Sequence, residues 1–209
     1  MKRSITATGL LSLVAMILVG VFSTGSASAV SQFLWTGPLP GVVLVLSTNT
    51  QFFQAIPGGA PIECAHFGAR GLASNGKAMT TKEITLIGTY SKCKAAGLFS
   101  ATVSTAEYLL NANGSVAVVG SPIVVTVPEL NCTLKISASA NGAGPNSNLN
   151  TIKFLNEPQS ILAHVEVIEG IISLSSGGEC GKAGEEFTKG TYRGLLLASV
   201  DGGTLQWDA

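Results

Sequence analysis

Hydrophobic and polar positions alternate along most of the chain, in short runs that are rich in Val, Ile, Thr and Phe. The segment from 132 to 140 shows this most clearly, because Leu134, Ile136 and Ala138 fall on one side and the residues between them are polar. A period of two is typical of a strand with one buried face, and helical spacing does not persist anywhere. The pattern therefore predicts an all-β chain.

Residues that favour turns separate the expected strands. These strands cover residues 42–46, 51–56, 62–73, 83–90, 98–110, 115–119, 123–127, 132–140, 151–156, 162–174, 192–200 and 204–207. Asn113-Gly114 and Asp201-Gly202 favour hairpins, since these residue types accept a positive φ. Near Ile168-Glu169-Gly170 the alternation loses phase, which predicts a β-bulge. The spacing predicts a single antiparallel domain over residues 30–209, folded as a β-sandwich or a barrel.

The first 29 residues have a different character. Lys2 and Arg3 precede an uncharged stretch from Leu10 to Phe22, and small residues follow it up to Ala29. This order predicts the helix of a secretory signal peptide that is cleaved after Ala29. An uncleaved anchor is the alternative, but the apolar stretch is shorter than the ~20 residues that cross a bilayer. We therefore expect a secreted, extracellular protein.

Composition narrows the choice of partners. The 209 residues include 12 basic and 12 acidic side chains, and charged residues make up only 11% of the chain. Cleavage after Ala29 leaves 10 basic and 12 acidic side chains, a net charge of about −2. Such a balance argues against binding nucleic acid, which depends on basic side chains. The mature chain contains no apolar stretch long enough for a transmembrane helix, because His164 and Glu166 interrupt the longest candidate.

Four cysteines lie in the mature part, at positions 64, 93, 132 and 180. An even number in an exported chain favours disulfides, and four cysteines allow three pairings between which the sequence alone does not choose. Pairing of neighbours would close loops that stabilise the fold by roughly 3–4 kcal/mol each. Cys64 and His66 form a Cys-x-His pair, but no second close pair of ligands accompanies them, so we predict neither a metal nor a cofactor.

Several segments resemble a known group of proteins. They are residues 53–64, 84–93 with Gly97 behind them, 132–136, the segment around Cys180, and Lys189-Gly-Thr-Tyr-Arg-Gly194. These segments resemble exported proteins of soil actinobacteria in which a signal peptide precedes an all-β domain rich in Gly, Thr and Ser. The resemblance implies export, an all-β fold and disulfides, and it implies no activity.

The same resemblance implies a disulfide pairing. Many members of that group carry six cysteines, and this chain has Ala106 and Gly120 where the third and fourth would align. The absence of both suggests that those two cysteines are partners. The remaining four would then pair as Cys64–Cys93 and Cys132–Cys180.

Residues that carry chemistry are scarce. The Gly-x-Ser-x-Gly pentapeptide of common hydrolases is absent, and Ser74-Asn-Gly-Lys77 has the composition of a turn. Glu166 and His164 are weak catalytic candidates, because two residues apart on a strand they project from the same face. A glycosidase would need a second carboxylate facing Glu166. An ordinary solvated strand face is the alternative.

Aromatic residues near the ends of expected strands are the binding candidates, namely Trp35, Tyr108, Tyr192 and Trp207. Exposed rings on a rigid sheet suit stacking on sugars, whereas buried rings would only fill the core. The favoured hypothesis is a secreted, non-catalytic binding or surface-interaction domain, whose partner is a cell-wall or environmental polysaccharide or a surface protein. The alternatives are a secreted hydrolase that uses Glu166 and a membrane-active β protein that inserts residues 108–127.

Overall fold

The computed structural model describes residues 31–37, 41–72, 80–137 and 152–208, and for residues 168–170 it describes the backbone alone. The expected signal peptide with its cleavage site at Ala29 and the segment Ser74–Lys77 lie outside these residues. Within them the chain forms antiparallel strands with two short 3-10 turns, so the all-β prediction is confirmed. No helix in the described part of the chain is long and apolar enough to cross a membrane.

The strands follow one another closely along the chain. Their bounds are β1 Gln32–Thr36, β2 Val42–Ser47, β3 Gln51–Gln54, β4 Ile62–Leu72, β5 Thr80–Thr81, β6 Glu83–Ala95, β7 Phe99–Val103, β8 Ala106–Asn111, β9 Val116–Val119, β10 Ile123–Val127, β11 Cys132–Ser137, β12 Ile152–Asn156, β13 Ser160–Ser175, β14 Glu186–Val200 and β15 Thr204–Asp208. The 3-10 turns are η1 Pro128–Leu130 and η2 Gly178–Cys180.

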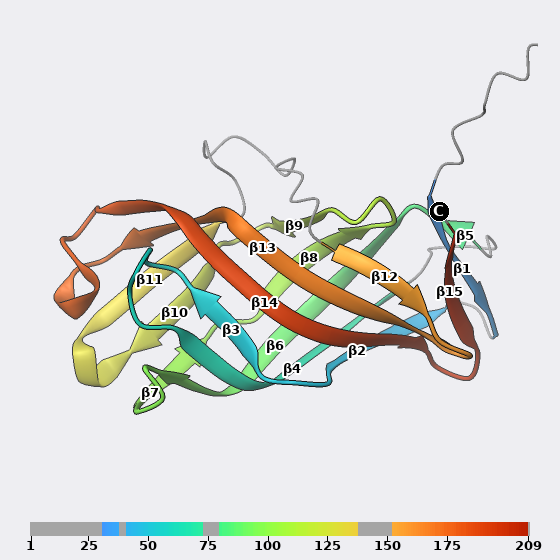
Figure 1. The fold of residues 1–209 in the computed structure, drawn as a ribbon, viewed down its shortest axis with the longest axis horizontal. Helices are drawn as coiled ribbons and strands as arrows, with labels where there is room; N and C mark the ends of the chain where they lie inside the picture. Colours follow the sequence, from blue (N-terminus) through green and yellow to red (C-terminus); the bar gives the residue numbers. More distant parts are fainter. Residues whose placement is uncertain (1–30, 38–40, 73–79, 138–151, 209) are drawn as a thin grey trace, which may run out of the picture.

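The main sheet closes on itself. Antiparallel pairing runs from β14 through β3, β4, β6, β7, β10, β11 and β13 and returns to β14. Of the two expected architectures, the fold is therefore the barrel. Figure 1 shows this closed sheet from the side. Buried side chains from its strands meet in the interior.

At the end of the molecule near the small sheet, the strands pair with different neighbours and the sheet has two edges. There β14 pairs with β2, β6 pairs with β8, and β9 and β12 lie at the two edges. A hydrogen bond from the Ile152 amide to the Gly114 carbonyl joins these edges. The small sheet β15-β1-β5 lies at this end (Figure 1), and its Phe33, Trp35 and Leu205 side chains are buried.

Most expected strands are present, with shifted ends. The expected strand 98–110 is wrong in one respect, because it divides into β7 and β8 at Ser104. On one side both segments pair with β6, but on the other side β7 pairs with β10 and β8 pairs with β9. The Ser104 amide donates to the Val124 carbonyl, and the Ser104 hydroxyl accepts from the Val124 amide. Sequence patterning misses β1, where the run Phe33-Leu34-Trp35 is apolar without alternation, and β5, which has only two residues.

The two predicted hairpins have different outcomes. Asn113-Gly114 joins the paired strands β8 and β9, as expected. Asp201-Gly202 forms a turn, but β15 pairs with β1 in the small sheet, so the hairpin prediction is wrong. The backbone of Gly203 packs against β1 so closely that a Cβ atom would lie 1.7 Å from the Thr36 carbonyl oxygen. The glycines at this turn therefore let the chain cross to the second sheet.

The bulge and the disulfides of the structure agree with the predictions made from the sequence. The register between β13 and β14 shifts between Val167 and Ile171, where the bulge was expected. Cys64 bonds to Cys93, its direct neighbour across β4 and β6, and Cys132 bonds to Cys180 in η2. Both pairings implied by the resemblance are confirmed.

The interior holds two clusters of buried side chains. One contains the four disulfide-bonded cysteines, and the other lies beneath the small sheet.

Candidate functional site: a cavity lined by tyrosines

The site begins at a break between β2 and β3. Ser47 is the last residue of β2 and Asn49 lies in the break, and both side chains accept hydrogen bonds from backbone amides of neighbouring strands. The Ser47 hydroxyl accepts from the Phe67 amide at 2.8 Å, and Asn49 Oδ1 accepts from the Leu195 amide at 2.9 Å. The break thus remains attached to β4 on one side and β14 on the other.

Beyond the break, Gln51 is fully buried. Its Nε2 donates to the carbonyl oxygen of Asn49 and to Asn49 Oδ1, at 2.8 and 3.0 Å. Its Oε1 accepts from the Tyr192 hydroxyl. Opposite it on β14 is Gly194, where a Cβ atom would lie 1.8 Å from Gln51 Oε1. The polar side chain fits in the interior because this position has no side chain of its own.

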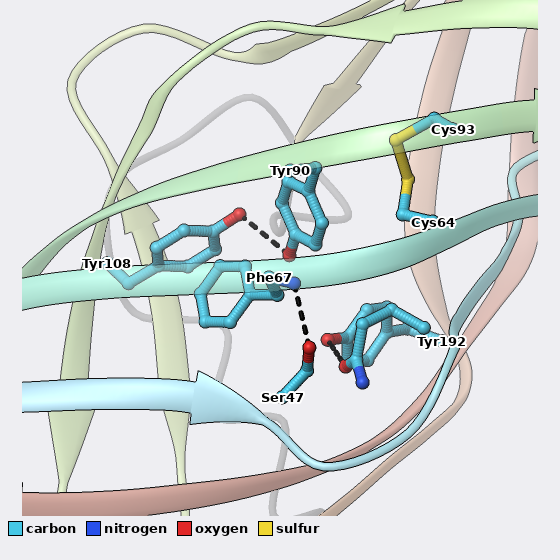
Figure 2. The surroundings of a disulfide bond; sticks show 8 residues. Ser47, Cys64, Phe67, Tyr90, Cys93, Tyr108 and Tyr192 are labelled. Carbon is cyan, nitrogen blue, oxygen red and sulfur yellow. Dashed lines mark hydrogen bonds between the residues drawn. A yellow bond between two sulfur atoms is a disulfide. The ribbon is translucent and has the colours of Figure 1, made fainter.

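Three tyrosine hydroxyls gather in the same interior. Tyr90 projects from β6, Tyr108 from β8 and Tyr192 from β14. The Tyr108 hydroxyl donates to the Tyr90 hydroxyl at 3.1 Å, as Figure 2 shows. These are all the tyrosines of the chain.

A row of small residues makes space for the rings. Ala69, Gly88 and Ala106 lie side by side on β4, β6 and β8. A Cβ atom on Gly88 would lie 2.7 Å from a ring carbon of Phe67 and 2.9 Å from one of Tyr108. The rings therefore occupy the space that larger side chains in this row would take.

The rings and the aliphatic side chains around them leave a cavity of about 110 Å³. Its described lining comes from both core clusters and consists of aliphatic and aromatic side chains, none of them charged. A cavity of about 150 Å³ with such a lining stays dry and admits benzene in another protein. This cavity is thus of the size and polarity for a small apolar molecule.

Removal from water has a clear effect on the three hydroxyls. Burial raises the pKa of Tyr108 to about 12, and it raises those of Tyr90 and Tyr192 well above the ordinary value. Coulombic repulsion from the neighbouring tyrosines adds to the rise for Tyr90 and Tyr192. The interior therefore disfavours negative charge.

The structure divides the four predicted binding residues into two pairs. Tyr108 and Tyr192 line the cavity. Trp35 is buried and Trp207 is partly buried, both in the small sheet. None of the four belongs to the exposed large hydrophobic residues, so stacking of these rings on a surface polysaccharide does not fit their positions.

Trp207 has a structural role at the end of the closed sheet. Its indole nitrogen donates to the Ala112 carbonyl beside the β8–β9 turn, at 2.7 Å. Its backbone exchanges two hydrogen bonds with the Asn156 side chain at the end of β12. Trp207 thus links the β8–β9 turn with the end of the edge strand β12.

The predicted catalytic candidates lie on the outer surface. His164 lines a groove of about 730 Å³, together with Phe52, Leu155 and Arg193. Glu166 lies next to this groove, and its carboxylate is 3.7 Å from Arg193 Nε in an exposed ion pair. The two candidates are therefore close to each other, on the face of β13 opposite Val165 and Val167, which line the tyrosine cavity.

Sequence reasoning missed the central residue of the site, Gln51, and did not choose Tyr90. One signal was present, because the alternation of β6 and β8 places Tyr90 and Tyr108 on the inward face. No signal marked Gln51, which is polar where the pattern requires an apolar residue. Cys64 is in a disulfide, and the described residues contain no group of three or more His, Cys, Asp or Glu that could hold a metal.

The chain matches no protein-family model, and comparisons with curated proteins and with solved structures find no match either.

Proposed function

We propose that the chain is an exported, non-catalytic binding protein that holds a small apolar molecule inside its closed sheet. The observation that carries the proposal is the cavity of about 110 Å³ around Tyr90, Tyr108 and Tyr192. Burial of apolar ligand surface there would supply roughly 25 cal/mol per Å². Export and secretion are part of the proposal, since disulfides suit an oxidising compartment.

The construction of the interior supports a binding role. Well-packed cores rarely contain voids larger than a water molecule, so a larger apolar cavity calls for an occupant. The polar side chains beside the cavity are hydrogen-bonded, Tyr108 to Tyr90 and Gln51 to Tyr192 and Asn49, which keeps them inside without water. A ligand would therefore replace empty space and would not need to displace bound water.

The test is a titration of the disulfide-bonded protein with toluene, followed by NMR of ¹³C-labelled tyrosine. Because every tyrosine lines the cavity, each labelled signal reports on the site. We expect saturable shifts of these signals. The variant Ala163→Leu fills the cavity and should abolish the shifts, whereas Ala65→Leu on the exposed face of β4 should retain them. Unchanged tyrosine signals in the wild-type protein would refute the proposal.

The outer groove favours a second candidate function, which is binding of a neutral polysaccharide. The half-exposed ring of Phe52 lies beside Arg193, which is its direct neighbour across β3 and β14. Arg193 is paired with Glu166, so the groove offers a ring and hydrogen-bonding groups with little net charge. Saturable retention on an insoluble polysaccharide, lost in Phe52→Ala, would support this function. Equal retention of both proteins would refute it.

A further inference from the structure

We propose that the outer face of β12, β13, β14 and β2 binds the surface of a phospholipid membrane. Figure 1 shows these strands next to one another. Their outward leucines form what we call the leucine face, namely Leu44, Leu46, Leu155, Leu162, Leu195 and Leu197. The inference goes beyond the proposed function, because the leucine face lies outside the sheet and the cavity lies inside it.

Part of the leucine face is one continuous row across four strands. Leu155 on β12 pairs with Leu162 on β13. Leu162 in turn pairs with Leu197 on β14, and Leu197 pairs with Leu46 on β2. The side chains at the two ends of the row, Leu155 and Leu46, are 59% and 62% exposed. Beyond Leu46 the next position is Gly68 on β4, which has no side chain to cover it.

These strands depart from the alternation of apolar and polar residues. Residues 42–46 on β2 are all apolar, and so are residues 195–197 on β14. On β2, Val43 and Val45 are buried in the core, so the leucines between and after them point outward. A sheet face in contact with water carries polar residues, whereas apolar residues on both faces are typical of strands that are covered on both sides. The outer face therefore has the composition of a covered surface.

The shape of the face argues against a second copy of the chain as the covering partner. The main sheet curves around the buried side chains of its strands, so its outer face is convex. Two convex faces touch along a narrow strip, whereas a stable dimer buries about 800 Å² on each partner. Adjacent strands are about 4.8 Å apart, so the leucine row is only about 14 Å long. A fluid lipid surface deforms around a convex face and needs no matching shape.

Basic side chains at both ends of the leucine face fit the phosphate groups of lipids. Lys153 precedes Leu155 by two residues on the same side of β12, and Arg70 on β4 pairs with Leu44. Both basic side chains are exposed, and within the described ranges neither has a recorded ion pair. Long basic side chains can bind headgroups while apolar neighbours enter the acyl region. Because the acid Glu157 also lies beside the row, apolar burial supplies most of the binding and anionic lipid adds little.

The test is flotation of the disulfide-bonded protein with phosphatidylcholine vesicles, with and without phosphatidylglycerol. We expect the wild-type protein to float with both. Leu46→Asn should weaken the partition by about tenfold, because it removes an exposed leucine that lipid would bury. Leu98→Asn is the matched control, since Leu98 is 79% exposed between β6 and β7, outside the leucine face, and this variant should float like the wild type.

Two further comparisons separate this inference from the other proposals. Ala163→Leu fills the cavity and should float like the wild type. Leu46 does not line the outer groove, so Leu46→Asn should leave retention on a polysaccharide unchanged. Absence of flotation of the wild-type protein, or an equal loss in Leu46→Asn and Leu98→Asn, would overturn the inference. So would a dimer of the free protein that Leu46→Asn dissociates.

A second measurement uses the wild-type protein alone, in case Leu46→Asn does not fold. NMR of ¹³C-methyl leucine is recorded with bicelles that contain a lipid spin-labelled in its acyl chain. The methyl signals of Leu46 and Leu155 should broaden, and those of Leu98 should not. Equal broadening of all three leucines, or none, would overturn the inference. Neither result affects the toluene titration, which tests the proposed function separately.

Discussion

Among single residues, Gly194 has the clearest effect on the interior, because it makes space for the amide of Gln51. A polar side chain that is fully buried at the centre of an apolar sheet is stable only while its hydrogen bonds are complete. The hydrogen bonds of Gln51 are made with Asn49 in the strand break and with Tyr192 on β14, and Gly194 leaves the space that the amide occupies. No local pattern in the sequence could have brought them together.

We expect Gly194→Ala to destabilise the protein by about 1–3 kcal/mol, the usual cost of forcing atoms into a packed core. The reason is the 1.8 Å approach of its new Cβ atom to Gln51 Oε1. Urea unfolding of the disulfide-bonded protein measures the change. Gly68→Ala is the matched control, since its Cβ atom would meet only Leu46 at an ordinary 3.7 Å. Equal stability of the two variants would contradict this account of Gln51.

The tyrosines predict how stability depends on pH. Their pKa values are raised in the folded protein, to about 12 for Tyr108, while the unfolded chain ionises near 10. Below pH 10 both states keep these protons, so the stabilisation is complete. Above pH 10 the unfolded state releases protons that the folded state retains, so stability should fall as pH rises toward and beyond 12.

Ultraviolet absorbance of tyrosinate measures this directly, because all three tyrosines lie in the cavity. The folded protein should show little tyrosinate at pH 10 and should ionise together with unfolding at higher pH. The same chain in concentrated urea should titrate near 10. Ionisation near 10 without unfolding would mean that the hydroxyls are in contact with water.

Among the elements, alternation predicted the long strands because each has one face in the core and one in solvent. It missed two of the three strands of the small sheet, namely β1, whose Phe33-Leu34-Trp35 run shows no alternation, and the two-residue β5. It also predicted a hairpin at Asp201-Gly202, since turn residues reveal that the chain reverses but not which strand it then joins. That choice depends on packing around Gly203 and Thr36, which are 167 residues apart in the sequence.

The pairing of β8 and β9 gives a test of the sequence resemblance. Glu107 pairs with Val119, so Ala106 on β8 and Gly120, one residue beyond the end of β9, are the next two facing positions. Neighbouring residues across antiparallel strands have Cα atoms about 4.5–5.5 Å apart, a range that a disulfide spans.

We therefore expect the double variant Ala106→Cys with Gly120→Cys to form a third disulfide on oxidation. Mass spectrometry of unreduced peptides would detect it, with each single variant as the control for mixed pairing. Retention of both new thiols in the free form, with the two existing disulfides intact, would remove the support for treating these positions as partners.

For the whole molecule, closure of the sheet has the largest consequence. A closed circuit of strands collects inward side chains from all sides into one interior, and small residues in one row then leave space next to large rings. The small sheet and Trp207 cover the end where β9 and β12 do not pair. The sequence predicted alternation on each strand, but closure depends on pairings between distant strands that no single strand encodes.

Diffraction from crystals of residues 30–209 under xenon pressure tests the central claim most directly, because xenon enters dry apolar cavities without needing any specific contact. The account predicts a xenon site inside the closed sheet, between the rings of Tyr90, Tyr108 and Tyr192. The site should disappear in Ala163→Leu and persist in Ala65→Leu. An interior without xenon in the wild-type protein, filled with ordered water or with side chains, would contradict the claim that the protein encloses a binding cavity.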